Sequence, residues 1–126
     1  MMKLKLLVGT TLLSFLWAMA PAQAENPANL KLLLTTNQCI WCYLGDARLS
    51  GASLPGAVVA GSSFENADLS NANLSNTNMI GTDLRGANLE GANLEGANLA
   101  GADTEGANFK NANLKGARMP DGRIHP

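Results

Sequence analysis

Between residues 42 and 121 apolar positions recur every five residues without an insertion. Divided at this spacing, the segment gives sixteen units, with an apolar third residue in fifteen and Ala as the first residue in twelve. The fifth residue is Gly, Asn or Asp in every unit. A period of five makes no stripe on an α-helix, and it alternates faces on a flat strand. The apolar residues can share one core only if the chain turns within each unit, at the Gly and Asn positions that tolerate positive φ.

This pattern gives each position of the unit a direction. We expect the small first residue and the large third residue to face inward, and the second, fourth and fifth residues to face water. A disordered low-complexity tract is the alternative, but such tracts lack regularly spaced Leu. The sequence therefore predicts a folded repeat array.

The register, A-[DN]-L-x-x in tandem, resembles the pentapeptide-repeat family over residues 42–121, and ANLEG-ANLEG-ANLAG at residues 87–101 is a plain instance. The resemblance implies an all-β fold, a right-handed four-sided β-solenoid (a quadrilateral β-helix) with one unit on each side. Sixteen units would then make about four coils. Residues 32–52 also resemble the segment that precedes the repeats in exported cyanobacterial members of the family, from the periplasm or the thylakoid lumen.

The charged fourth residues of the units support a coil of twenty residues. Residues twenty apart would lie on neighbouring strands, where opposite charges stabilise by ~0.2–1 kcal/mol a pair. All four charged pairs at this spacing are opposite in sign, namely Glu65–Arg85, Arg85–Glu105, Glu90–Lys110 and Glu95–Lys115.

Residues 1–24 are expected to be a secretory signal peptide. A short basic start containing Lys3 and Lys5 precedes an apolar stretch from Leu6 to Ala20, and Ala22-Gln23-Ala24 fits the small-x-small cleavage rule. An uncleaved membrane anchor is the alternative, but the apolar stretch is short for a span of ~20 residues. Cleavage after Ala24 would export the chain to a periplasm or thylakoid lumen, where disulfides persist.

Residues 25–41 are expected to cover the first coil. Asn26 followed by Pro27 is typical of a helix start, and it predicts a short helix over about residues 27–36. Cys39 and Cys42 come next. When the repeat register is extended backward, Cys39 takes an inward third position and Cys42 an inward first position.

Three interpretations of this cysteine pair stay open. The register favours a structural pair, a candidate disulfide at the start of the first coil. The C-x-x-C spacing in an exported chain is also found in thiol-redox sites, although the strand-to-helix setting of thioredoxin-like proteins is missing. A metal site would need two further ligands, and His125 lies far along the chain.

One of the four expected sides carries mostly apolar outward residues. A contiguous apolar strip is typical of a contact surface, so this strip is a candidate site for a protein partner or a membrane face. Small residues on a flat sheet with no role are the alternative. The strip comprises Ile40, Trp41, Val58, Ala60, Ile80 and Ala100.

The C-terminal end differs from the N-terminal end. Residues 122–126 form a tail that is too short for a capping helix, and His125 is expected to be a solvated tail residue. The last coil is therefore a candidate for an end-to-end homodimer through Phe109, Leu114 and Met119, because an uncovered solenoid end invites association.

Composition narrows the function. Without residues 1–24 the chain carries seven basic and ten acidic residues, a net charge of −3, which argues against general nucleic-acid binding. The sequence contains no nucleophile–base pair and no phosphate loop, so we expect no catalytic residues, no cofactor and no metal. The favoured function is a non-enzymatic, exported scaffold or protein-interaction module. The alternatives are a thiol-redox protein using Cys39 and Cys42, and a DNA-mimicking inhibitor of DNA gyrase, an activity found in the family that the sequence resembles.

Overall fold

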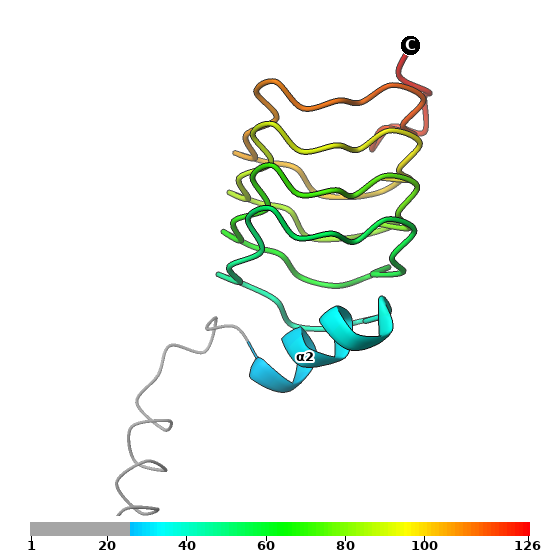
Figure 1. Cartoon of the computed structure of the whole chain (residues 1–126). Helices are drawn as coiled ribbons and strands as arrows, with labels where there is room; N and C mark the ends of the chain where they lie inside the picture. Colours follow the sequence, from blue (N-terminus) through cyan, green and yellow to red (C-terminus); the bar gives the residue numbers. More distant parts are fainter. Residues whose placement is uncertain (1–25) are drawn as a thin grey trace, which may run out of the picture.

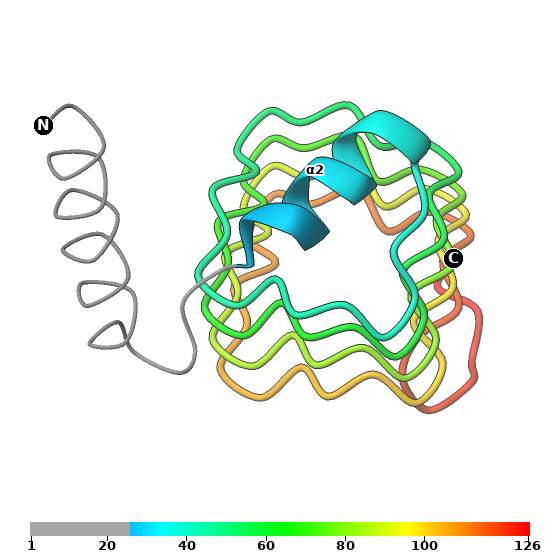
Figure 2. The ribbon, with the colours of Figure 1, turned by 90° about the horizontal axis from the view of Figure 1, so that it is seen from below.

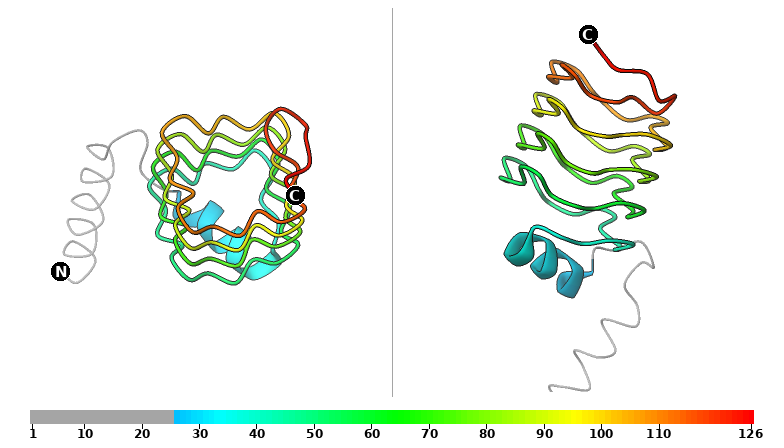
Figure 3. Two further views of the ribbon diagram at one scale, coloured as in Figure 1. Left: turned by 90° about the horizontal axis from the view of Figure 1, so that it is seen from above. Right: turned by 90° about the vertical axis from the view of Figure 1, so that its right-hand side faces the viewer.

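The computed structural model describes residues 26–126, which form a β-solenoid with one α-helix at its N-terminal end (Figure 1). The coils stack along a single axis, and the chain ends at the far end of the stack (Figure 3). The predicted signal peptide, residues 1–24, lies outside the described residues.

A tight turn closes each five-residue unit. In the first unit the Ala47 N–H donates to the Leu44 carbonyl at 3.2 Å, and Asp46 between them has a φ of 59°. Positive φ at the second central residue is a feature of type II turns, and it explains the Gly, Asn and Asp residues at the fifth position. The same conformation recurs at every fifth position from Asp46 to Gly116.

Neighbouring coils pair with a fixed offset of twenty residues. The Leu49 N–H donates to the Asp68 carbonyl at 2.8 Å, and the Asp68 N–H donates to the Ala47 carbonyl at 2.9 Å. Parallel single-residue bridges repeat this pairing from Gln38↔Val58 to Asn98↔Arg118. With a turn every fifth residue, four units complete a coil, and Figure 2 shows the coils as four-sided rings.

The core is built from the first and third residues of the units. The first residues are mostly Ala, which allows the chain to approach the axis at each corner, and the third residues fill the interior. Four columns of third residues run along the axis, and their members outside the last coil are buried: Leu44, Phe64 and Leu84; Leu49, Leu69 and Leu89; Leu54, Leu74 and Leu94; Val59, Met79 and Leu99.

Helix α2, Pro27–Thr36, lies across the N-terminal end of the solenoid (Figure 2). The Asn26 side chain accepts hydrogen bonds from the N–H groups of Ala28 and Asn29, at 3.0 and 3.3 Å, and so caps the helix. Asn37 ends the helix in a left-handed conformation. Leu33 is fully buried and belongs to the core, so the helix covers the interior of the first coil.

Polar groups around α2 also occupy part of the first coil's backbone edge. Asn37 Nδ2 donates to the Pro55 carbonyl at 2.8 Å, and Thr36 Oγ1 donates to the Gln38 carbonyl at 3.1 Å. Asn29 Nδ2 donates to the Tyr43 carbonyl at 3.4 Å. These bonds take up carbonyl groups that would otherwise be open to another strand.

The C-terminal tail folds back onto the last coil. Ile124 forms an antiparallel bridge with Arg118, and the His125 N–H donates to the Ala117 carbonyl at 2.8 Å. The sequence predicted a tail at residues 122–126 that is too short for a capping helix, and it did not predict that the tail backbone pairs with the last coil. Gly122, with a φ of 86°, allows the chain to reverse, and the open edge of residues 116–119 supplies the hydrogen-bond partners. The His125 side chain is exposed.

The tail covers the backbone edge of only one side of the last coil. Within residues 26–126, the N–H groups of Thr104, Phe109 and Leu114 have no backbone acceptor. The side chains of Phe109, Leu114 and Met119 are partly buried. The end-to-end contact through these three residues stays a prediction.

Candidate protein-contact surface

The predicted apolar strip lies on one side of the solenoid, which we call the fourth side. It is formed by residues 37–41, 57–61, 77–81, 97–101 and 117–121, which pair with each other in order along the axis. Its large apolar side chains are exposed, with Ile40 at 53%, Trp41 at 82% and Ile80 at 43%. Val58, Ala60 and Ala100 on the same side are partly exposed.

The other three sides are polar at the same positions. Their fourth residues are mainly Ser, Glu, Lys and Arg, which favours hydration. On the fourth side the fourth residues are Ile40, Ala60, Ile80, Ala100 and Pro120. From residue 37 to residue 101 the fourth side carries no charged residue, so partner binding over this length would desolvate no charged group of that side.

Trp41 has an unusual backbone conformation. Its φ is 57°, in the left-handed region that bulky residues rarely adopt. Its ring lies against the backbone of Gly61 in the next coil, where an added Cβ would be 2.6 Å from a ring carbon. Only a residue without a side chain at position 61 leaves room for the Trp41 ring. The six-membered ring of the indole approaches the solenoid at Gly61, while most of the side chain stays exposed.

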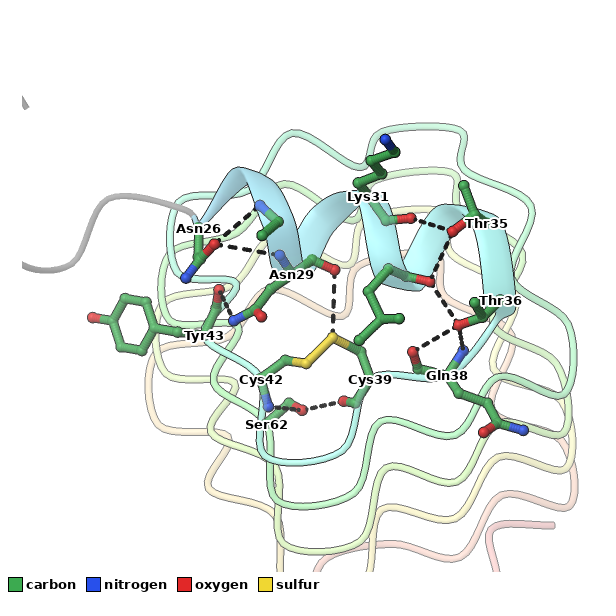
Figure 4. The surroundings of a disulfide bond; sticks show 12 residues. Asn26, Asn29, Lys31, Thr35, Thr36, Gln38, Cys39, Cys42, Tyr43 and Ser62 are labelled. Atoms are coloured by element: carbon green, nitrogen blue, oxygen red, sulfur yellow. Dashed lines mark hydrogen bonds between the residues drawn. A yellow bond between two sulfur atoms is a disulfide. The ribbon is translucent and has the colours of Figure 1, made fainter. Parts of the chain in front are cut away.

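Trp41 lies within a turn that a disulfide spans. Cys39 and Cys42 are bonded in the structure, with their Cα atoms 5.5 Å apart (Figure 4). In the other units the corresponding residues, a third residue and the first residue three positions later, are joined by a backbone hydrogen bond. The C-x-x-C spacing thus equals the spacing of the two ends of every turn in this fold. The disulfide joins those ends covalently.

The hydroxyl of Ser62 completes this turn. Ser62 Oγ donates to the Cys39 carbonyl at 2.6 Å and accepts from the Cys42 N–H at 2.9 Å, so it bridges the two groups (Figure 4). Ser62 is fully buried. It follows Cys42 in the column of first residues, one coil further along the axis. The repeat pattern alone assigns no role to Ser62, which stands where most units have Ala. Its position twenty residues after Cys42 was the available signal.

The disulfide is shielded from solvent. Cys39 is 1% exposed and Cys42 is 8% exposed. Helix α2 covers the pair, with the Asn29 carbonyl oxygen 3.4 Å from Cys39 Sγ. Because a disulfide sulfur carries no hydrogen, this is a packing contact. A reductant could reach the sulfurs only after α2 moves away.

Arg85 lies at the centre of a cluster of charged residues. The guanidinium lies 2.7 Å from Asp83 and 3.8 Å from both Glu65 and Asp103. Of the four charged pairs predicted from a coil of twenty residues, only Glu65–Arg85 is within ion-pair distance in the described part of the chain. The predicted offset of twenty residues is confirmed for the other three pairs, because the N–H groups that follow Arg85, Glu90 and Glu95 donate to the carbonyls of Glu105, Lys110 and Lys115. Their charged groups do not approach to ion-pair distance.

The second residues of the units explain this difference. Asp103 takes the place of Glu105 beside Arg85. Glu90 and Glu95 accept hydrogen bonds from Asn108 and Asn113, at 3.5 and 3.3 Å. Amide groups on the neighbouring strand are thus the nearer partners of these carboxylates.

Hydrogen bonding shifts the pKa of several charged groups outside the fourth side. The Arg85 side chain, which donates to the carboxylate, lowers the pKa of Asp83, and Asp83 in turn raises the pKa of Arg85. The side chain and backbone N–H of Ser70 donate to Asp68 and lower its pKa. These short polar contacts hold exposed side chains in place on the other sides of the solenoid.

The part of the chain that the structure describes offers neither a metal-binding cluster nor a membrane-spanning helix. No three His, Cys, Asp or Glu side chains lie together there in a group that could hold a metal ion. Between residues 26 and 126, no helix has the length and apolar content needed to cross a membrane.

A family comparison agrees with this repeat geometry. Pentapeptide repeats, in eight copies, match residues 42–79, 56–91 and 87–121. The chain belongs to the pentapeptide-repeat family. The resemblance seen in the sequence is thus confirmed, and solved structures similar to this pentapeptide-repeat protein are right-handed β-solenoids.

Three solved structures illustrate the relationship. HetL, a pentapeptide repeat protein involved in heterocyst differentiation regulation from Nostoc sp. strain PCC 7120, is 42% identical over 70% of this chain and 43% of its own, with a TM-score of 0.42. AT2G44920 from the Arabidopsis thaliana thylakoid lumen is 28% identical over 83% of this chain and 79% of its own, with a TM-score of 0.52. The protein alr5209, also from Nostoc, is 32% identical over 77% of this chain and 82% of its own, with a TM-score of 0.36.

The match to HetL is limited in length, since this pentapeptide-repeat protein spans less than half of HetL. Among curated proteins, none matches the chain.

Proposed function

We propose that this pentapeptide-repeat protein is an exported, non-enzymatic interaction module that binds a protein partner through its fourth side. The observation that carries the proposal is the contiguous run of uncharged, outward side chains from Ile40 to Ala100, with Ile40, Trp41 and Ile80 exposed. Exposed apolar strips of this kind mark contact surfaces in soluble proteins. The large aromatic ring of Trp41 is also a typical anchor of protein interfaces.

Two features of the chain support an exported location. The signal-like residues 1–24, with a cleavage motif ending at Ala24, would direct the chain out of the cytoplasm. A disulfide between Cys39 and Cys42 is stable in such a compartment. The similarity to AT2G44920, a thylakoid lumen protein, is in line with this proposal.

Cross-linking followed by capture from the native compartment tests the contact surface. We expect the full chain to retain partner proteins that Ile80→Glu loses, because the substitution places a charge in the middle of the strip. Ser75→Glu is the matched control, since it places the same charge at the same position of the same coil on the neighbouring side. Equal capture by Ile80→Glu and the unchanged chain would refute the fourth side as the contact surface.

The thiol-redox alternative makes a different prediction. The disulfide is buried beneath α2, so we expect it to react slowly with thiol reagents in the folded chain. Peptide mapping without reduction should recover a peptide that contains both Cys39 and Cys42 in disulfide linkage. Fast-reacting free thiols in the exported protein would favour the redox function instead.

The gyrase-inhibitor alternative requires a surface that resembles the charge of DNA. Arg85 lies within 4 Å of three carboxylates and interrupts the acidic region of the solenoid. We therefore expect no inhibition of DNA supercoiling by gyrase. Inhibition at stoichiometric protein would favour the DNA-mimic function over the interaction module.

A further inference from the structure

The outward residues of the fourth side alternate in size along the solenoid axis. Ile40, Ala60, Ile80 and Ala100 follow each other at intervals of twenty residues, in the order large, small, large, small. Because residues in neighbouring coils are ~4.8 Å apart, a ridge recurs every ~10 Å with a hollow between. The surface is therefore corrugated with a period of two coils.

We propose that this corrugated surface binds a second copy of the chain, side by side and antiparallel. The inference rests on the proposed function, because it names the partner of the same surface. A two-fold axis parallel to the strands of the fourth side reverses the solenoid direction and places the same columns of two copies opposite each other. In one register, every ridge then meets a hollow. Ile40 faces Ala100 of the second copy, and Ile80 faces Ala60.

The column of fifth residues fits the same register. It reads Trp41, Gly61, Gly81 and Gly101, and the ring of Trp41 already lies over Gly61 of its own copy. The register sets Trp41 opposite Gly101 of the second copy and Gly61 opposite Gly81. Because the Trp41 ring lies over Gly61, it faces Gly81 as well. A Cβ added at Gly81 or Gly101 would have nothing within 4 Å, so open space for an indole ring lies beside both glycines. The one large residue in the column thus meets the positions that have no side chain.

Charge also favours a second copy at this side. The second residues of the overlapping coils are Gln38, Val58, Asn78 and Asn98, none of which is charged. Arg118 and Asp121 lie one coil beyond the overlap. Two copies of an acidic chain repel each other through most of their surface, and the fourth side lets them meet without like charges in contact.

Light scattering during gel filtration tests whether the chain forms this dimer. The sample is the full chain expressed and exported in its cell, so that any signal peptide is removed there. We expect the unchanged protein to reach twice the mass of one chain as its concentration rises. Ala60→Ile should return it to the mass of one chain, because two Ile side chains then meet across the interface. Combining Ala60→Ile with Ile80→Ala exchanges ridge and hollow in both copies, so the double variant should form the dimer again. Circular dichroism of each variant shows that the fold is kept.

Three results would overturn the second copy as the partner. One is a single-chain mass for the unchanged protein at every concentration. Another is a dimer that Ala60→Ile leaves intact and Leu114→Glu disrupts, since the copies then associate through their ends. The third is a folded double variant that stays monomeric. If the protein is monomeric while Ile80→Glu still abolishes capture, the proposed function stands and only the choice of partner fails.

Discussion

At the residue scale, one hydroxyl takes the place of a backbone hydrogen bond in the turn that the disulfide spans. Ser62 Oγ bonds both the Cys39 carbonyl and the Cys42 N–H, which have no direct bond to each other. Thr82, in the same column, is different. Its hydroxyl donates to the Met79 carbonyl at 2.9 Å, and the Thr82 N–H already donates to that carbonyl. Within the same column of first residues, the Ser62 hydroxyl therefore replaces a backbone hydrogen bond, whereas the Thr82 hydroxyl only adds to one.

This difference predicts unequal costs for two similar substitutions. Ser62→Ala leaves a buried carbonyl and a buried N–H without their partner, and should lower the free energy of unfolding by ~1–3 kcal/mol. Thr82→Ala should be nearly neutral, because the backbone bond of its turn remains and Ala is the usual first residue. Urea denaturation of both variants provides the comparison. Equal losses in the two variants would contradict the role assigned to Ser62.

The Asp83–Arg85 contact predicts a dependence of stability on pH. Arg85 lowers the pKa of Asp83 in the folded chain. The carboxylate therefore stabilises the fold above its unfolded pKa, ~3.9, and this contribution is lost as the pH falls through the lower folded value. We expect Asp83→Asn to be less stable than the unchanged chain at pH 7, with the difference shrinking below pH ~4. Urea midpoints across this range measure it. A difference that stays constant with pH would count against the contact.

At the element scale, helix α2 packs on the solenoid through only one of its faces. Leu33 is completely buried in the core, whereas the neighbouring Leu34 is 55% exposed. The capping hydrogen bonds of Asn26 begin the helix, and Asn37 links its end to the first coil through Pro55. The helix thus closes the interior at the N-terminal end and covers the disulfide.

Two Leu→Ala substitutions separate packing from helix propensity. Leu33→Ala should lower the free energy of unfolding by ~2–5 kcal/mol, because it leaves a cavity over the first coil. Leu34→Ala changes the same residue type in the same helix and should have little effect. In addition, Leu33→Ala should make Cys39 and Cys42 easier to reduce, since α2 then separates more readily. Similar stabilities for the two variants would show that α2 does not close the core.

At the scale of the whole molecule, a large part of the fold could be predicted from the sequence, because the same inward and turn positions recur in every five-residue unit. The regular third residues give the interior columns, and Gly or Asn at the fifth position gives the turns. The backward extension of the register also led to Cys39 and Cys42, which the structure buries as the two ends of a turn.

Other features depend on side chains and backbone groups that meet only in space. Glu90 and Glu95 lie one coil from Lys110 and Lys115 as predicted, but their carboxylates accept hydrogen bonds from Asn108 and Asn113 instead. The return of Ile124 onto Arg118 has no periodic signal, since it depends on an open backbone edge. The bridging role of Ser62 likewise requires knowledge of which residues lie one coil apart.

The claim that the fourth side is the contact surface can be tested most directly with Trp41 itself. In a full chain that carries Trp17→Phe, Trp41 is the only tryptophan, and its side chain is 82% exposed. We predict that acrylamide quenching of its fluorescence falls when the protein dimerises or binds its partner, and that Ile80→Glu, unlike Ser75→Glu, prevents this protection. Association with no change in the quenching of Trp41 would contradict the account.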